Sequence, residues 1–191
     1  IEDFTKLLLG LDYAEFLSGK EEEIEAFILS FIRERVAQRI ATITKRHDII
    51  DAVVKSNTSS VPEQLKAAKV LSTVSEAEEF KGITEALNRV INISAKAQED
   101  ASGEISEERL ETESERTLVK AIKELQSKVQ TLTPEELYSH LEAMAPKIND
   151  FFNENMVMVD DEETRRNRLR FLGLLSQIIL DLADFTSLIV K

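Results

Sequence analysis

The chain has 191 residues, long enough for one generous domain or two small ones. It carries 24 Lys and Arg against 36 Asp and Glu, a net charge of −12, which excludes a uniformly basic nucleic-acid binder but leaves room for a local basic patch. With no cysteine, it has no disulfide, thiolate zinc site or cysteine nucleophile, and its two histidines leave little room for a histidine-based metal site. Scarce glycine (5) and proline (3), with 42% hydrophobic residues, predict helices around a sizeable core.

The first elements follow from apolar spacing. Residues 1–20 are interpreted as the tail of an upstream element or a linker, with a short apolar piece at 1–9, and the start at Ile1 rather than Met favours a piece of a longer protein. A long helix is expected at 21–44, because apolar residues recur every three or four positions, as in a buried stripe. A short helix is expected at 48–55. The stripe of the long helix comprises Ile24, Phe27, Ile28, Phe31, Ile32, Val36, Ile40 and Ile43.

Helix starts further along the chain carry capping signals. Ser60, Ser75 and Thr133 each precede a glutamate three residues later, which predicts three capping boxes. The box at Ser75 opens a helix to about residue 98, and the box at Thr133 opens one to about residue 153. An acidic start at residues 160–163 opens a last long helix to about residue 185, whose apolar residues surround it almost completely and predict a central core position.

Two segments differ from this pattern. Residues 98–116 are strongly acidic and are expected to form a solvated excursion between helices, with a helical segment at 106–131 overlapping it. Residues 156–159 are the β-like run of the chain, expected as an extended connector packed on the core. The nearly unbroken helices predict one all-α bundle over 21–191.

No catalytic or metal-binding constellation is evident. His47 and Asp48 are adjacent, as in metal phosphohydrolases, but the further ligands are missing, so Asp48 is expected to be a helix cap. The acidic run at residues 160–163 lacks the alternating ligands and the glycine of a calcium loop, and suits a helix start instead. We therefore expect no catalytic residue and no metal site, and the chain by itself is not expected to be an enzyme.

The clearest local positive patch comprises Arg35, Arg39, Lys45 and Arg46. Between residues 33 and 46 there are five basic residues and one acid. Complementation of the helix dipole would explain Lys45 and Arg46, which follow a helix end, but not Arg35.

A polar stripe lies on the helix that is expected to start at the Ser75 capping box. Arg89, Asn92 and Lys96 follow one another at i, i+3 and i+7, so they lie above one another on one face. This face could contact a phosphate backbone or base edges, and an ordinary solvated face is the alternative. In the last helix, Arg168 projects toward the apolar side and is expected to be a buried, paired structural arginine.

Three segments together resemble a known family. The run FFNENMVMVDDE (151–162) leads into RRNRLRFL (165–172), and two earlier segments, RHDIIDAV (46–53) and LNRVINI (87–93), match in the same order. They resemble the C-terminal end of the bacterial glycyl-tRNA synthetase beta subunit, where an anticodon-binding domain of the DALR type is found, as in arginyl-tRNA synthetase. The acidic segment matches no family motif and is interpreted as a variable insertion.

The resemblance implies an all-helical bundle of the DALR type that binds a glycine tRNA in the cytoplasm. In that family, glycine activation and transfer are attributed to a separate alpha subunit, with which the beta subunit forms a heterotetramer. ATP and magnesium would then bind the alpha subunit, with no cofactor in this chain and no membrane association. The residues expected to contact the nucleic acid are Arg35, Arg39, Lys45, Arg46, Arg89, Asn92 and Lys96.

A helical protein-interaction or scaffold domain without RNA binding is the alternative, and it suits the net charge of −12 better. The objection from charge is limited, because eight acids and two bases within residues 98–116 account for half of that net charge. Screening over about 8 Å at physiological salt prevents a distant acidic segment from cancelling a local basic patch.

Overall fold

The computed structural model describes residues 21–96 and 103–190, and every regular element in that part of the chain is helical. The prediction of an all-α protein is confirmed. The short apolar piece predicted at residues 1–9 lies outside the described residues. The helices are α3 (Glu21–Ile40), α4 (His47–Val54), α5 (Val61–Val74), α6 (Phe80–Ala95), α7 (Glu113–Gln126), α8 (Pro134–Glu154) and α9 (Glu162–Leu182), with short 3-10 helices η1 (Glu107–Arg109), η2 (Val129–Thr131) and η3 (Phe185–Ser187).

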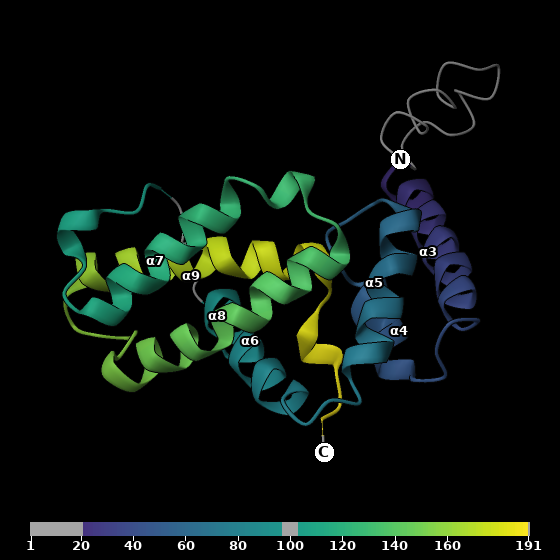
Figure 1. Cartoon of the computed structure of the whole chain (residues 1–191). Coiled ribbons are helices and arrows are strands. Elements are labelled where there is room, and N and C mark those ends of the chain that lie inside the picture. The colour runs from purple at the N-terminus through teal and green to yellow at the C-terminus, as the bar shows by residue number, and fades with distance from the viewer. Residues whose placement is uncertain (1–20, 97–102, 191) are drawn as a thin grey trace.

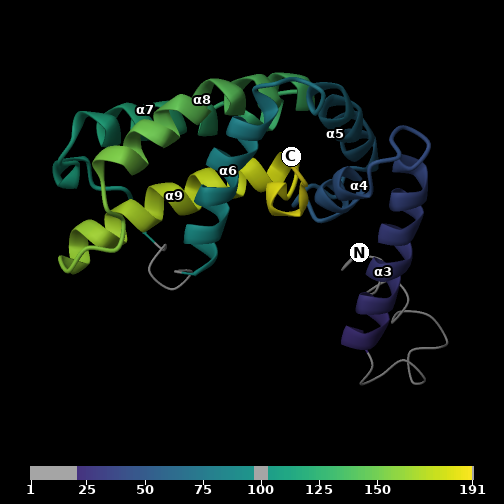
Figure 2. The same cartoon turned by 90° about the horizontal axis from the view of Figure 1, so that it is seen from below.

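The helices form an elongated body (Figure 1). Helices α3, α4 and α5 form one end, and α7, the C-terminal part of α8 and the start of α9 form the other (Figures 1 and 2). Helix α8 runs along the body and packs against α5, and α6 and η3 lie in the middle. The segment after α9 reaches back to α4, where the N–H of Asp184 donates to the carbonyl of Ala52 at 2.8 Å. The C-terminal segment thereby joins the two ends of the body.

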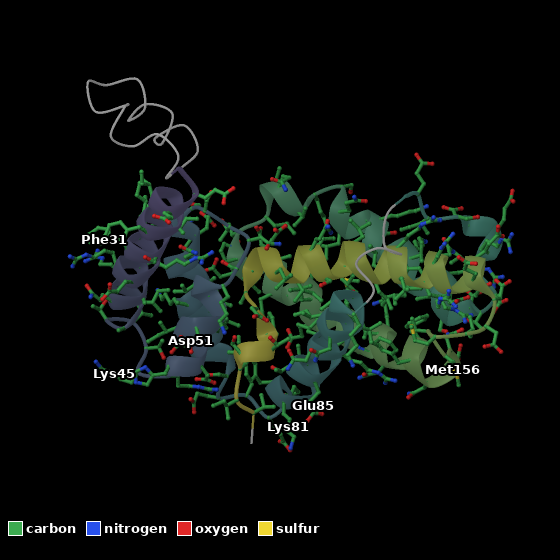
Figure 3. All side chains as sticks on the ribbon, turned by 180° about the vertical axis from the view of Figure 1, so that it is seen from behind. Phe31, Lys45, Asp51, Lys81, Glu85 and Met156 are labelled. Carbon is green, nitrogen blue, oxygen red and sulfur yellow. The ribbon has the colours of Figure 1, made fainter. Side chains whose placement is uncertain are left out.

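Helix α3 extends from this body, and only its C-terminal part lies beside other helices (Figure 2). It ends at Ile40, earlier than predicted, and Val36 and Ile40 are buried. Phe27 is 70% exposed and Phe31 49% exposed, and Phe31 lies on the outer side of the helix (Figure 3). The predicted burial of the whole stripe is wrong, because α4 and α5, against which α3 packs, cover only one end of the helix.

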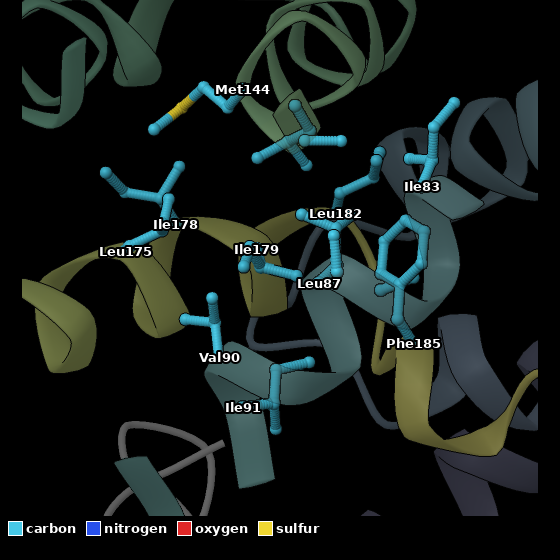
Figure 4. Packing of buried hydrophobic residues seen from close by; sticks show 14 of the residues in the cluster. Ile83, Leu87, Val90, Ile91, Met144, Leu175, Ile178, Ile179, Leu182 and Phe185 are labelled. Atoms are coloured by element: carbon cyan, nitrogen blue, oxygen red, sulfur yellow. The ribbon is translucent and has the colours of Figure 1, made fainter. Parts of the chain in front are cut away.

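Helix α9 is the central core element, as its all-round apolar pattern predicted. Leu172, Leu175 and Ile179 are completely buried. Helix α6 crosses α9, and α8 packs against both helices. Figure 4 shows side chains of α6, α8, α9 and η3 meeting in this core, among them Ile83, Leu87, Val90, Ile91, Met144, Leu175, Ile178, Ile179, Leu182 and Phe185.

Local capping chemistry fixes several helix starts. The hydroxyl of Ser60 accepts from the N–H of Glu63 at 3.4 Å, and Thr133 and Glu136 form the expected capping box. The box predicted at Ser75 is wrong. The Ser75 hydroxyl donates to the carbonyl of Ser72 at 3.1 Å and closes α5, so α6 begins five residues later, at Phe80.

The described part of the acidic segment is fastened to α9 at Ser106, while its acidic side chains other than Glu115 are exposed. The amide group of Asn167 holds Ser106 at both backbone atoms: Oδ1 accepts from the N–H at 2.8 Å and Nδ2 donates to the carbonyl at 2.9 Å. The helix predicted at 106–131 is divided into η1, α7 and η2, because an unpredicted capping box, formed by Thr112 and Glu115, starts α7. Glu115 is completely buried.

The connector between α8 and α9 packs on the core as predicted. Val157 is buried, whereas Met156 and Met158 are 72% and 63% exposed. Nη1 of Arg168 donates to the carbonyl of Met156 at 2.9 Å, which fixes the backbone of the connector.

Candidate nucleic-acid interface

The residues predicted to bind nucleic acid fall into two groups in the structure. The α3–α4 patch comprises Arg35, Arg39, Lys45 and Arg46, and the α6 stripe comprises Arg89, Asn92 and Lys96. Helices α4 and α5 and the 3-10 helix η3 lie between α3 and α6 (Figures 1 and 2). Figure 3 shows Lys45 near one end of the molecule and Met156 near the other, with Lys81 and Glu85 of α6 between them. The structure therefore does not bring the two groups together in one cluster.

Within the α3–α4 patch, Arg35 is held by its own helix. Its Cζ lies 5.0 Å from the centre of the Phe31 ring, and Nη1 donates to Oε1 of Gln38 at 3.3 Å. Arg39 and Lys45 are exposed. This part of the patch can offer cationic side chains to a polyanion.

Arg46 has a structural contact. Its Nε and Nη2 donate to the two carboxylate oxygens of Asp48 at 3.1 and 2.6 Å, and Nη2 also donates to the carbonyl of Ile189 at 2.9 Å. The hydrogen bond to Asp48 raises the pKa of Arg46. Burial raises the pKa of Asp48, but the hydrogen bonds from Arg46 and from the N–H of Ile189 outweigh it and lower the pKa. Arg46 thus fastens the C-terminal segment to α4, and its contact with nucleic acid stays a prediction.

The α6 stripe is exposed along its whole length. Cζ of Arg89 lies 4.0 Å from the centre of the Phe152 ring, which belongs to α8. Phe152 was not predicted as part of the site, since the sequence does not determine how α6 and α8 cross. The available signal was the Phe151–Phe152 pair at the end of a predicted helix.

Most other described arginines are engaged with carboxylates. Arg109 pairs with Glu163, Arg116 with Glu113 and Arg166 with Glu162. Arg168 is buried and paired, as predicted, and its partners are Glu115 and Glu111. The described part of the acidic segment lies at the end of the molecule opposite α3 (Figures 1 and 2), so the α3–α4 patch is remote from it.

The described residues offer neither a metal cluster nor a membrane-spanning helix. No group of three or more His, Cys, Asp or Glu side chains there is placed to hold a metal ion. None of the helices described is both long and apolar enough to span a membrane.

Comparison with known proteins decides the family. Residues 83–185, more than half of the chain, match the family described as DALR anticodon binding domain. The chain belongs to the DALR anticodon-binding family. The matched range of this DALR domain runs from α6 to η3, so it contains the α6 stripe and Phe152 and leaves the α3–α4 patch outside.

Relatives of the DALR domain include proteins named glycine–tRNA ligase beta subunit. The one from Lactobacillus acidophilus is 33% identical over 191 residues, and the one from Lactiplantibacillus plantarum is 34% identical, covering 100% and 99% of this chain. The one from Streptococcus pyogenes is 37% identical over 87% of the chain. The chain spans about a quarter of the length of these relatives, 27% of the first two and 24% of the third.

Proposed function

We propose that the chain binds the anticodon arm of a glycine tRNA, as the anticodon-binding module of a glycine–tRNA ligase beta subunit. The observation that carries this proposal is the DALR match over residues 83–185, which spans the α6–α9 core and its exposed polar stripe. The relatives named glycine–tRNA ligase beta subunit support the assignment to glycine.

The α6 stripe and the α3–α4 patch supply suitable chemistry. Arginine has a planar fork that can grip phosphate or stack on an exposed base, and asparagine offers a donor and an acceptor to a base edge. In this proposal, Arg35, Arg39 and Lys45 contact phosphates, and Asn92 reads a base. Lys96 lies one turn beyond Asn92 and faces the backbone of the loop.

In this proposal, the chemical steps of the ligation take place on a partner chain. An alpha subunit, joined to the beta subunit in a heterotetramer, activates glycine and transfers it to the tRNA. ATP and magnesium then bind that subunit, and this chain contributes affinity and selectivity for the tRNA. The complex works in the cytoplasm, where tRNA is charged.

The test compares variants by their affinity for a glycine tRNA anticodon stem–loop, measured by fluorescence anisotropy at about 50 and about 200 mM salt. Removing Arg35 and Arg39 together should weaken binding to all anticodon loops and reduce the salt slope by about 0.7 for each lost phosphate contact. Removing Asn92 should instead reduce discrimination between anticodons by about 5- to 150-fold, since a good base contact is worth about 1–3 kcal/mol.

Lys69→Ala/Lys120→Ala is the matched control, because these lysines are exposed on α5 and α7, outside both groups. It should leave the affinity and the salt slope close to wild type. If the wild-type chain binds the glycine stem–loop no better than an unrelated hairpin, the proposed function is wrong.

A protein-interaction role is the second candidate, and the exposed face of α3 favours it. Phe27 and Phe31 on that face are 70% and 49% exposed, more than a solvated helix requires. Phe27→Ser/Phe31→Ser distinguishes the two roles. A protein-interaction domain would lose association with its partner subunit while showing no tRNA binding in either form.

A further inference from the structure

Arg89 and Phe152 form a contact between α6 and α8 that places a cation on an aromatic face. The distance of 4.0 Å from Cζ to the ring centre is van der Waals contact, well inside the range of about 6 Å over which a cation is attracted to a ring. Phe152 is 7% exposed, whereas Arg89 is exposed. The ring is therefore covered by the guanidinium, and the arginine side chain remains accessible from solvent.

The ring beneath the guanidinium is fixed by two further rings. Phe152 contacts Phe151 with ring centres 5.0 Å apart, and Phe151 meets the ring of Phe171 edge-on at 5.3 Å. Phe151 and Phe171 are completely buried. This aromatic chain extends from the surface of α8 to the core face of α9, so Arg89 lies on a rigid support. A support of this kind lowers the conformational entropy that the arginine loses when it binds a ligand.

Arg89 makes no ion pair within the described part of the chain. In the part of the chain that the structure describes, no carboxylate pairs with Arg89, although Glu85 lies one turn earlier on the same helix. Arg35, the comparable arginine on α3, rests on a ring that is 49% exposed and donates to Gln38. Arg89 thus combines a fixed aromatic support with an uncommitted charge.

We propose that Arg89, held in place by Phe152, is a stacking platform for one unpaired base of the anticodon loop. Unstacked loop bases in RNA bind by stacking on aromatic rings or on guanidinium planes. Asn92 lies one turn along the same face, where it can reach the edge of a base stacked on Arg89. In this arrangement Arg89 contacts the base and Phe152 is a positioning residue. The inference rests on the proposed function and assigns one contact within it.

The experiment is a coupling measurement on the full chain. The probe is the glycine tRNA anticodon stem–loop, used intact and in a series in which one loop base at a time is replaced by an abasic residue. With wild-type protein, one abasic position should weaken binding by about 5- to 150-fold, the range for loss of one stacked base. Arg89→Lys keeps the charge but loses the plane, so it should weaken binding of the intact loop and abolish the penalty at that abasic position.

Variants of Phe152 test the support. Phe152→Tyr keeps a ring beneath the guanidinium and should retain the abasic penalty. Phe152→Leu keeps an apolar side chain but removes the ring, and should reduce the penalty while the protein remains folded by circular dichroism. Arg33→Lys is the matched control, a charge-conserving change at an exposed arginine of α3, and it should retain the wild-type pattern.

The outcomes separate this inference from the proposed function. If Arg89→Lys binds the stem–loop and shows the wild-type abasic pattern, the platform is wrong and the anticodon function stands. If wild-type protein does not select the glycine stem–loop, both are wrong. If Arg89→Lys leaves RNA binding unchanged but weakens binding to the partner subunit, the surface is a protein contact and the platform is overturned.

Discussion

Arg168 and Glu115 form an ion pair inside the protein, with Nε of Arg168 2.6 Å from Oε1 of Glu115 and side chains that are 5% and 0% exposed. Both residues have further structural contacts. Oε2 of Glu115 accepts the backbone N–H groups of Glu111 and Thr112 at 2.6 and 3.0 Å, which caps α7. Arg168 also holds the connector at Met156. This pair therefore joins α7, the connector and α9.

Removing either partner should be destabilising, because a buried charge would lose its ion pair. Arg168 would keep its second carboxylate partner, Glu111, at 2.8 Å, and Glu115 would keep its two backbone N–H donors. We expect Arg168→Met and Glu115→Gln each to lower the free energy of unfolding by about 1.5–3 kcal/mol, the range for a hydrogen bond to a charged group. The double variant should lose less than the sum of the single losses, with a coupling of about 1–3 kcal/mol. Urea denaturation followed by circular dichroism gives all three values. Strictly additive losses would show that the two side chains act independently.

The sequence predicts the burial of one residue of this pair, Arg168, but not that of the other, Glu115. Arg168 was predicted to be buried and paired, because helical periodicity places it beside the apolar face of α9. Glu115 was assigned to a solvated acidic segment, because its burial depends on a partner far along the chain. The contact between Arg89 and Phe152 was missed for the same reason: helical periodicity gives the face of each helix, but not how two helices cross.

Helix caps are limited in a similar way: the sequence shows the capping residues but not which hydrogen bond each of them will form. The start of α8 at Thr133 followed from a motif of four residues whose groups satisfy one another. The same motif at Ser75 failed because that hydroxyl has a competing acceptor, the carbonyl of Ser72, on the preceding helix. The fold class and most helices could therefore be predicted, whereas the choice between competing local bonds needed the tertiary structure.

The ion pair of Arg46 and Asp48 should make stability depend on pH. The pKa of Asp48 is lower in the folded protein than its usual value, so the folded state binds fewer protons than the unfolded state as that carboxyl titrates. Its contribution is present above the unfolded pKa of about 3.9 and is lost as the pH falls through the folded pKa. We expect Asp48→Asn to lower the free energy of unfolding by about 1–3 kcal/mol at neutral pH, the range for a hydrogen-bonded charge.

Urea titrations at a series of pH values measure this effect. The difference between Asp48→Asn and wild type should shrink toward zero as the pH falls through the lowered folded pKa of Asp48, below which both carry a neutral side chain. Asp51→Asn, at an exposed position of the same helix, is the control and should not change the pH dependence. A loss from Asp48→Asn that is equally large at acid and neutral pH would assign the effect to packing instead of charge.

The apolar stripe of α3 should divide into a part that stabilises the fold and a part that does not. Ile40 is completely buried and Phe27 is 70% exposed, although both belong to the same three-and-four pattern. We expect Ile40→Ala to lower the free energy of unfolding by about 2–5 kcal/mol, the cost of deleting a buried aliphatic side chain. Phe27→Ser should change it by less than about 0.5 kcal/mol, as surface substitutions do.

Urea denaturation at two protein concentrations completes this test. If Phe27 is exposed in solution, the result for Phe27→Ser is the same at both concentrations. A loss above about 1 kcal/mol that grows with concentration would mean that association buries this face, since only the folded, associated state gains from mass action. A large loss independent of concentration would place Phe27 in an intramolecular contact and contradict the exposed position of α3. The comparison with Ile40 matters because the two residues are indistinguishable by pattern, so burial by α4 and α5 is the physical difference between them.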